Sequence, residues 1–428
     1  MLVGTSSWTS MSESIFDTLP DELVEFILAK ADVDDILGFL QVATRFRQII
    51  LQSTHLQYLI ELAADGLEDG SSSELCFADR LQALRQRRAA RATLEPTARR
   101  TVTCDGTGRR VAFGSHLVWY RAETSEICIL QIPSVFRAIP EKEWTVQGPS
   151  VTGELLHSLT IDPNQDLLVT LIVGQDGQKL GIRSLSTGGH HPVAATPILY
   201  IDRVPWEESE FKVEEIYVSN NYLGFRLVFG DHRWVMKEQI MVYDWTSGRH
   251  ILSVSQEAAR AGIGFTFLTD QYLLLVYSGT QDDNYEFKFV LSVIDMNSLP
   301  SGNTTEMVIS ELQPTCSLLL PLLPAVPPSP IEINVNTHHP WHTTHMRLPF
   351  LCPSDDRLVA ITLSWSRLTT RLHTILDFVA RAKSDPAKRV FGWDEWGKDR
   401  CRLVEDRFKE SASVSGVQND STYAMLGT

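Results

Sequence analysis

The side chains best suited to metal chemistry lie in one histidine-rich stretch, His338 to His345. His339, His342 and His345 recur at steps of three, so their imidazole rings could meet one metal ion if the stretch were helical. Pro340 interrupts that periodicity, and no carboxylate lies beside the histidines. We therefore expect a polar loop here and predict no metal-binding residue.

The sequence contains no motif of a common enzyme class. It has no Gly-x-Ser-x-Gly elbow, no phosphate-binding Walker loop and no His-Glu-x-x-His pair. Gly106-Thr107-Gly108 lacks the later lysine of a phosphate loop and is typical of a hairpin turn. We predict no catalytic residue and no cofactor.

The overall charge argues against a surface that binds polyanions. Lys and Arg number 38 against 53 Asp and Glu, a formal charge of −15, which gives no general attraction to nucleic acid or anionic lipid. The six cysteines are widely separated, so free thiols in a reducing compartment are expected. Residues 1–13 lack the apolar core of a signal peptide and are expected to be disordered. We expect a cytoplasmic or nuclear protein that binds neither nucleic acid nor membrane.

Two structural regions must position these side chains, and the change between them falls near Pro96. Residues 14–66 have helical periodicity, residues 67–101 form an Arg-rich helical linker, and residues 102–409 have the pattern of short strands and turns. Residues 410–428 are expected to form a flexible tail. The predicted fold class is α+β in separate domains.

The linker is expected to place Leu81 and Leu84 on the following domain, while its arginine stems cover the flanks. A nucleic-acid patch is the alternative for these arginines, but aromatic residues for base stacking are missing.

The helical region begins with a recognisable helix start. Pro20 suits the first turn, and Asp21 and Glu22 follow at the positive end of the helix dipole. Asp34 or Asp35 can cap a second helix. Four short helices in about 50 residues cannot bury all of their apolar faces against one another. Part of this surface is therefore expected to meet a partner.

The β region shows a loose repeat. An Asp or Asn precedes an apolar run at Asp166, Asn221, Asp270 and Asp356, and a strand ending in a Thr/Ser-Gly turn follows. Spacings of about 50 to 60 residues predict a β-propeller-like domain with one four-stranded sheet per unit. A Pro-rich insertion near 314–345 interrupts the repeat. A two-sheet sandwich and an incomplete propeller remain as alternatives, because nothing in the sequence shows that the ring closes.

Two segments of the first domain form a recognisable pair, Leu19-Pro20-Asp21-Glu22-Leu23-Val24-Glu25-Phe26-Ile27-Leu28 and Asp35-Ile36-Leu37-Gly38-Phe39-Leu40-Gln41-Val42-Ala43-Thr44-Arg45-Phe46-Arg47. In these residues the first domain closely resembles the F-box. Gly392-Trp393-Asp394-Glu395-Trp396-Gly397 looks like a segment of large fungal F-box families whose remaining chain is β-rich. The sequence departs from the F-box pattern at Ala31 and over Leu56 to Tyr58, which predicts less buried apolar area and weaker binding.

The F-box resemblance implies docking to a Skp-type adaptor, which joins a cullin and a RING protein. The chain would then be the substrate receptor of an SCF ubiquitin ligase and would also bind a target protein. Leu19, Pro20, Leu23 and Ile27 are the expected adaptor contacts. A mixture of core and interface is expected for Phe26, Leu37, Leu40, Val42, Phe46 and Ile49.

Three alternatives stay open. The helical region could simply pack on its own β region, as it would in a β-propeller enzyme or a metal-dependent hydrolase. An F-box protein could also act outside the ligase. Exposed tryptophans could anchor a ligand, although aromatic residues in strands more often belong to a core; the candidates are Trp206, Trp234, Trp245 and Trp341.

Overall fold

The structure is a computed structural model that describes most of the chain in sixteen segments. The predicted disordered start, the histidine-rich stretch and the tail from residue 406 lie outside them. The segments are 18–70, 75–93, 110–113, 116–133, 140–148, 155–174, 177–201, 211–230, 235–257, 262–278, 288–299, 306–321, 333–337, 349–351, 357–363 and 366–405.

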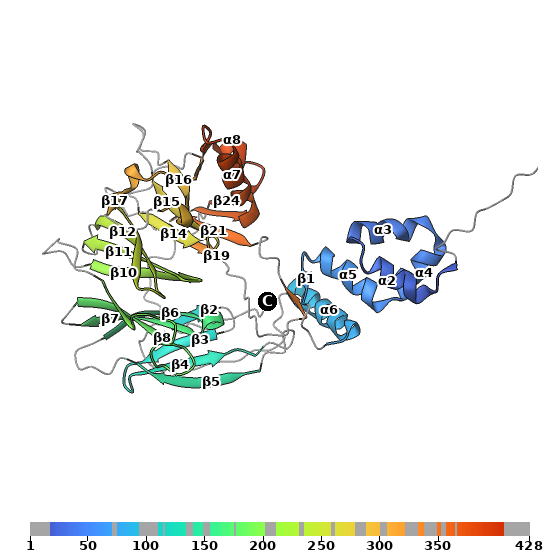
Figure 1. Cartoon of the computed structure of the whole chain (residues 1–428), viewed down its shortest axis with the longest axis horizontal. Coiled ribbons are helices and arrows are strands. Elements are labelled where there is room, and N and C mark those ends of the chain that lie inside the picture. Colours follow the sequence, from blue (N-terminus) through green and yellow to red (C-terminus); the bar gives the residue numbers. More distant parts are fainter. Residues whose placement is uncertain are drawn as a thin grey trace, which may run out of the picture.

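Among its described residues, the helical region has four short helices and one longer helix (Figure 1). Their bounds are α2 (Asp21–Leu28), α3 (Val33–Val42), α4 (Thr44–Gln52), α5 (Thr54–Ala64) and α6 (Phe77–Thr93). The start of α2 matches the sequence pattern, because Pro20 directly precedes it and Asp21 and Glu22 occupy its first turn. The apolar core shared by α2, α3, α4 and α5 is formed by Val24, Leu28, Ile36, Ile49, Ile50 and Leu56.

The Arg-rich helix α6 belongs to this same helical region. Leu81 and Leu84 pack in a cluster with Tyr58 and Leu62 of α5. The one buried member of that cluster from the β region is Phe350. The expectation that these leucines lie on the following domain holds only for their contact with Phe350, because α5 supplies the larger apolar face beside them.

The described strands of the β region form five successive sheets of four or five strands. Sheet 1 contains β2 (Arg110–Phe113), β3 (His116–Arg121), β4 (Glu126–Gln131) and β5 (Lys142–Gln147). Sheet 2 contains β6 (Leu155–Asp162), β7 (Leu167–Gly174), β8 (Gly177–Ser184) and β9 (Ile198–Ile201). Sheet 3 contains β10 (Phe211–Ser219), β11 (Tyr222–Gly230), β12 (Val235–Asp244), β13 (Arg249–Glu257) and β17 (Met307–Val308).

The last two sheets are associated with two helices inserted between their strands in the sequence. Sheet 4 contains β14 (Ile263–Phe267), β15 (Tyr272–Ser278), β16 (Phe289–Asp295), β18 (Cys316–Leu319) and β23 (Val390–Phe391). Sheet 5 contains β19 (Ile333–Thr337), β21 (Leu358–Leu363), β22 (Ser366–Arg371) and β24 (Cys401–Glu405). Helices α7 (Leu372–Ser384) and α8 (Trp393–Trp396) lie between β22 and β24 in the sequence. Three short 3-10 helices are η1 (Pro163–Gln165), η2 (Met296–Ser298) and η3 (Ile309–Glu311).

The repeat seen in the sequence corresponds to the second strand of sheets 2 to 5. β7, β11, β15 and β21 begin just after the four acidic or amide positions of that repeat. A backbone hydrogen bond also recurs from the residue after the third strand to a carbonyl before the second. It joins Leu185 to Asp166 at 2.7 Å, Trp245 to Asn221 at 3.0 Å, Met296 to Gln271 at 2.8 Å and Leu372 to Arg357 at 2.7 Å. The four units therefore share one local geometry.

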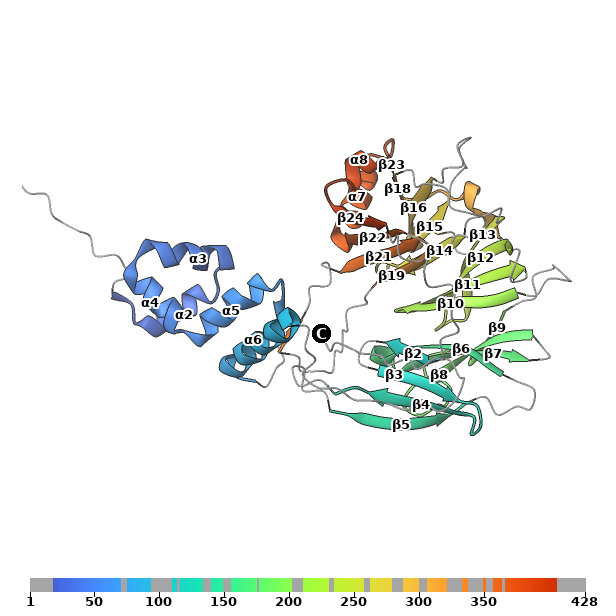
Figure 2. The same cartoon turned by 180° about the vertical axis from the view of Figure 1, so that it is seen from behind.

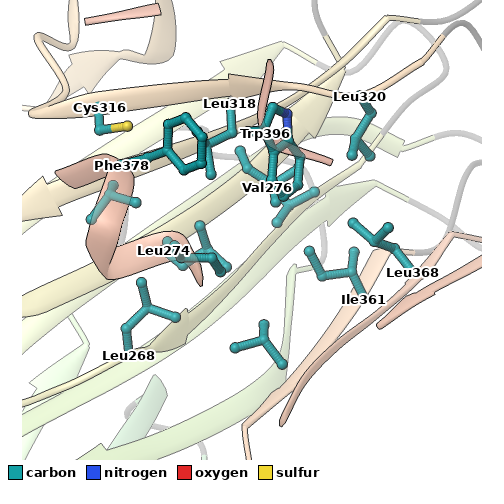
Figure 3. Close-up of a cluster of buried hydrophobic side chains, with 14 of the residues drawn as sticks. Leu268, Leu274, Val276, Cys316, Leu318, Leu320, Ile361, Leu368, Phe378 and Trp396 are labelled. Carbon is teal, nitrogen blue, oxygen red and sulfur yellow. The ribbon is translucent and has the colours of Figure 1, made fainter. Parts of the chain in front are cut away.

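Each sheet packs on the next through an apolar core. The first strands of consecutive sheets contact one another, from β2 to β6, β10, β14 and β19. Figure 3 shows the core between sheets 4 and 5, where Phe378 of α7 and Trp396 of α8 join Leu274 and Leu368. The indole N–H of Trp396 donates to the carbonyl of Leu319 at 2.8 Å. These two helices, which the strand pattern did not predict, supply side chains to that core.

Two short strands from later parts of the chain extend sheets 3 and 4. β17 pairs in parallel with β13 of sheet 3, and β23 pairs in parallel with β18 of sheet 4. Among the described strands the sheets form no closed barrel, and the fold is mostly β with a small helical region (Figures 1 and 2). Within the described residues no helix is both long and apolar enough to cross a bilayer.

Candidate protein-docking surface

Helix α2 has one buried face and one exposed apolar face. Val24 and Leu28, four residues apart, are buried in the helical core. Leu23, Phe26 and Ile27 occupy the other face at helical spacing and are 50%, 64% and 45% exposed. These three residues are the α2 ridge. Isolated apolar residues are common on surfaces, whereas three neighbours on one helix face suit a protein contact.

Polar contacts hold α2 without covering the ridge. Arg45 of α4 donates to the carbonyl of Leu19 and to Asp21 Oδ1, the latter at 2.6 Å from Nη2. The Ser53 hydroxyl donates to Glu25 Oε1 at 2.6 Å. The same hydroxyl accepts from the N–H of Leu56 at 3.1 Å and so caps α5. The position of α2 is therefore fixed by α4 and by the start of α5.

Three of the four expected contact residues are exposed. Pro20, Leu23 and Ile27 lie at the surface, and Leu19 is half-buried. The six residues expected to be a mixture of core and interface fall into three groups. Phe26, Leu37 and Val42 are exposed, Leu40 and Phe46 are half-buried, and Ile49 is buried. Phe46 packs edge-to-face on Phe39, with ring centroids 5.3 Å apart. Phe26 is thus the most exposed residue of the α2 ridge. Its position three residues after Leu23, on the same helix face, is the sequence pattern that could have identified it as a contact residue.

Leu56 and Tyr58, in the stretch that departs from the F-box pattern, are both fully buried in the helical region. Ala31 is half-buried and packs against the helical core. Tyr58 instead places its hydroxyl at the contact with the β region.

A short strand pairing and an apolar cluster attach the helical region to the β region, and together they form the junction. β1 (Glu68–Asp69) pairs antiparallel with β20 (Phe350–Leu351), which lies between β19 and β21 in the sequence. Phe350 is buried in the α5–α6 cluster, and the Arg87 guanidinium lies 5.8 Å from the centre of its ring. Figures 1 and 2 show β1 and α6 nearest to the sheets, with α2, α3 and α4 farther away. The ridge is therefore borne on the part of the helical region that lies away from the sheets.

Other candidate chemistry is sparse in the described part of the chain. No group of three or more His, Cys, Asp or Glu side chains is arranged to hold a metal there. Trp245 is buried, and its indole N–H donates to the carbonyl of Asn220 at 2.8 Å, so it is a core residue. Trp206, Trp234 and Trp341 lie outside the described residues, as does the histidine-rich stretch.

A shallow pocket of about 480 Å³ lies between α5 and α6. Arg85, on its wall, donates to Glu61 Oε1 at 2.6 Å. This neighbouring carboxylate, through its hydrogen bond, raises the pKa of Arg85 above its ordinary value against the opposing effect of burial. The Arg85 guanidinium is therefore paired with the Glu61 carboxylate. The residues that line the pocket suggest no reaction.

Comparisons with known proteins give only distant similarities. No protein-family model matches the chain, and no curated protein matches it. An uncharacterized protein from Listeria monocytogenes is 12% identical, with a TM-score of 0.33 over 64% of this chain and 66% of that one. The match therefore spans just under two thirds of the Listeria protein.

Two other solved structures are similar at the same distant level. Prolyl oligopeptidase B from Galerina marginata, bound to a 35mer hydrolysis and macrocyclization substrate, is 10% identical, with a TM-score of 0.27 over 60% of this chain and 29% of that one. Hsv2 from Kluyvelomyces marxianus is 9% identical, with a TM-score of 0.24 over 60% of this chain and 77% of that one. These similarities do not assign the chain to a family.

Proposed function

We propose that the chain is the substrate-recognition subunit of an SCF-type ubiquitin ligase in the cytoplasm or nucleus. The helical region binds a Skp-type adaptor through the α2 ridge, and the adaptor joins the chain to a cullin. The β region binds the target protein. The chain contributes no catalytic residue, because its role is to raise the effective concentration of the target beside the transferring enzyme.

The exposure of Leu23, Phe26 and Ile27 carries the proposal. A helical region that served only to pack on its own sheets would turn such residues toward the strands. The described contacts with the β region instead involve Tyr58, Asp69 and α6. The F-box resemblance supplies the identity of the partner, and the exposed ridge supplies a surface of suitable chemistry.

The β region fits this proposal as an incomplete β-propeller whose five sheets are the blades. Support comes from the recurring backbone hydrogen bond at Leu185, Trp245, Met296 and Leu372 and from the apolar cores between consecutive sheets. Such an arrangement places loops from several sheets beside one another, where they can contact one target.

Calorimetry with the full-length chain and a purified Skp-type adaptor tests the proposal. The wild-type chain is expected to bind, and Leu23→Asp combined with Ile27→Asp is expected to weaken binding at least about 100-fold, since two apolar anchors contribute roughly 2 kcal/mol each. Leu155→Asp combined with Val193→Asp is the matched control, because these exposed apolar residues lie in the β region.

Absence of adaptor binding at micromolar concentration overturns the proposal. Equal weakening of adaptor binding by the control pair also overturns it, because the loss could then not be assigned to the α2 ridge. Co-purification of a cullin with the adaptor distinguishes a ligase subunit from an F-box protein that acts outside the ligase.

A further inference from the structure

Sheet 5 is buried on only one face. Along β21, Val359, Ile361 and Leu363 are buried, whereas the residues between them are not. Along β22 the same alternation leaves Arg367 and Arg371 exposed. The second strand of sheet 2 differs, because five consecutive residues from Leu167 are buried. The unburied side of sheet 5 is the outer face, made by Leu358, Ala360, Thr362, Arg367, Thr369, Arg371, Arg402 and Val404.

Three arginines form a basic stripe on the outer face. Arg367 and Arg371 lie four residues apart on one strand, about 13 Å at the rise of an extended chain. Arg402 on β24 lies opposite Thr369, between them. The described residues of this face include no acidic side chain, although the chain as a whole carries a formal charge of −15.

Apolar side chains stand beside the arginines. Leu358 lies opposite Arg371, and Val404 lies opposite Arg367. They are 47% and 44% exposed. The face therefore offers both guanidinium groups and apolar contacts to the same ligand.

Closure of the β region onto sheet 1 does not account for the basic stripe. The face of sheet 1 that carries Leu117, Trp119, Cys128 and Leu130 is already buried in the structure, so it offers no open surface to the arginines of sheet 5. The part of the stripe that contains Arg367 and Arg402 is thus better explained as a surface that remains available to a charged ligand.

We infer that the outer face of sheet 5 binds an Asp/Glu-rich segment of a target protein. Guanidinium groups form paired hydrogen bonds with carboxylates, and Leu358 and Val404 can receive the segment's apolar side chains. The described outer face has no aromatic residue on which a nucleic-acid base could stack, which favours a protein ligand. The inference names a target class and in that respect rests on the proposed function, but binding to this face requires no adaptor.

Fluorescence anisotropy with the full-length chain tests the inference. The probe is a labelled synthetic peptide of about eight residues, long enough at about 3.3 Å per residue to cross the face, with Asp, Glu and two leucines. Arg367→Glu combined with Arg402→Glu is expected to weaken its binding at least about tenfold, and added salt is expected to weaken wild-type binding. Arg367→Gln combined with Arg402→Gln should give a smaller loss, because it removes charge without reversing it.

Arg91→Glu combined with Arg389→Glu is the matched control, because it makes the same charge change at exposed arginines elsewhere. This variant is expected to keep the wild-type affinity, and a peptide with Gln and Asn in place of the acids is expected to bind weakly. Circular dichroism establishes that all variants are folded.

Failure of the wild-type chain to bind the acidic peptide, or an equal loss in the control variant, overturns the inference. A poly-uridine oligonucleotide that binds more tightly than the peptide and is lost in the same variant also overturns it. Adaptor binding measured on the same preparations separates the two proposals: adaptor binding without peptide binding defeats only the inference, and the reverse defeats only the adaptor-docking function.

Discussion

The phenol hydroxyl of Tyr58 lies 2.7 Å from the backbone carbonyl oxygen of Pro349, joining positions 291 residues apart. The same hydroxyl lies 2.7 Å from Asp69 Oδ1, which also accepts from Arg80 Nη1 at 2.7 Å. Burial and the neighbouring Asp69 carboxylate raise the pKa of Tyr58 above its ordinary value, so the phenol remains a donor at neutral pH. This small network fixes where the helical region meets the β region.

Removing that hydroxyl is expected to loosen the junction. Tyr58→Phe leaves the buried packing intact but withdraws a donor from Asp69 and Pro349, which should cost about 1 to 2 kcal/mol locally. Hydrogen exchange should become faster at Gly70, whose N–H donates to the same Pro349 carbonyl at 3.1 Å. Tyr200→Phe, at an exposed tyrosine, is the control, and unchanged exchange at Gly70 would contradict the expectation.

Removing the ring of Phe350 is expected to release the helical region. Phe350→Ala takes a buried side chain out of the cluster of Tyr58, Leu81 and Leu84, a loss of about 3 kcal/mol or more. Small-angle scattering should then show a larger radius of gyration. Under the proposed ligase function, adaptor affinity should be unchanged, whereas target ubiquitination should fall because the junction would set the distance between target and adaptor. Val390→Ala, at an exposed strand residue, is the control, and an unchanged radius would argue against a positioning role.

Much of the arrangement could be predicted because it has a local cause. The second strands begin after Asp166, Asn221, Asp270 and Asp356 as the sequence indicates, since turn-forming residues followed by apolar runs mark strand starts. The exposed spacing of Leu23 and Ile27 is likewise a property of one helix.

The missed features depend on distant contacts. β20 has two residues and gives no local signal, and its partner β1 lies far away in the sequence. Helix α7 follows β22 directly with no side-chain cap at Arg371, so the usual start signal is missing. Phe26 and Ile49 are equally apolar in the sequence, and only the packing of α2 on α4 decides which is buried.

A buried arginine in sheet 3 is expected to be essential for stability. Arg226 lies between two carboxylates, 3.3 Å from Glu215 and 3.8 Å from Glu238, and donates to the carbonyl of Ile263 at 3.1 Å. Arg226→Met should destabilise the protein by about 3 to 5 kcal/mol, because it takes this cation away from the buried Glu238 and the half-buried Glu215. Urea unfolding followed by tryptophan fluorescence measures the loss.

Replacing the acids as well provides the matched test of that cause. Glu215→Gln and Glu238→Gln added to Arg226→Met should recover part of the stability, since a neutral amide at 238 can still accept from the Ile263 N–H. No recovery would mean that lost packing of the arginine, and not unpaired charge, causes the destabilisation.

Acid is expected to destabilise sheet 1 through His116. Burial lowers the pKa of His116 from 6.5 to about 4, so the folded protein resists protonation there while the unfolded chain does not. Stability from this group is complete above about pH 6.5 and declines as pH falls toward 4, by up to about 3 kcal/mol. His116→Gln should make the dependence of melting temperature on pH shallower over that interval. His190→Gln, at an exposed histidine, is the control; identical pH profiles for wild type and His116→Gln would contradict this account.

The parallel pairing of β23 with β18 has a consequence for biosynthesis. The outer strand of sheet 4 lies beyond β22 of sheet 5 in the sequence, so a growing polypeptide cannot finish sheet 4 until residues 390 and 391 have left the ribosome. Until then β18 presents an unprotected edge, of the kind that recruits chaperones or joins other nascent chains. Translation that stopped before residue 390 would therefore leave two sheets unfinished instead of one.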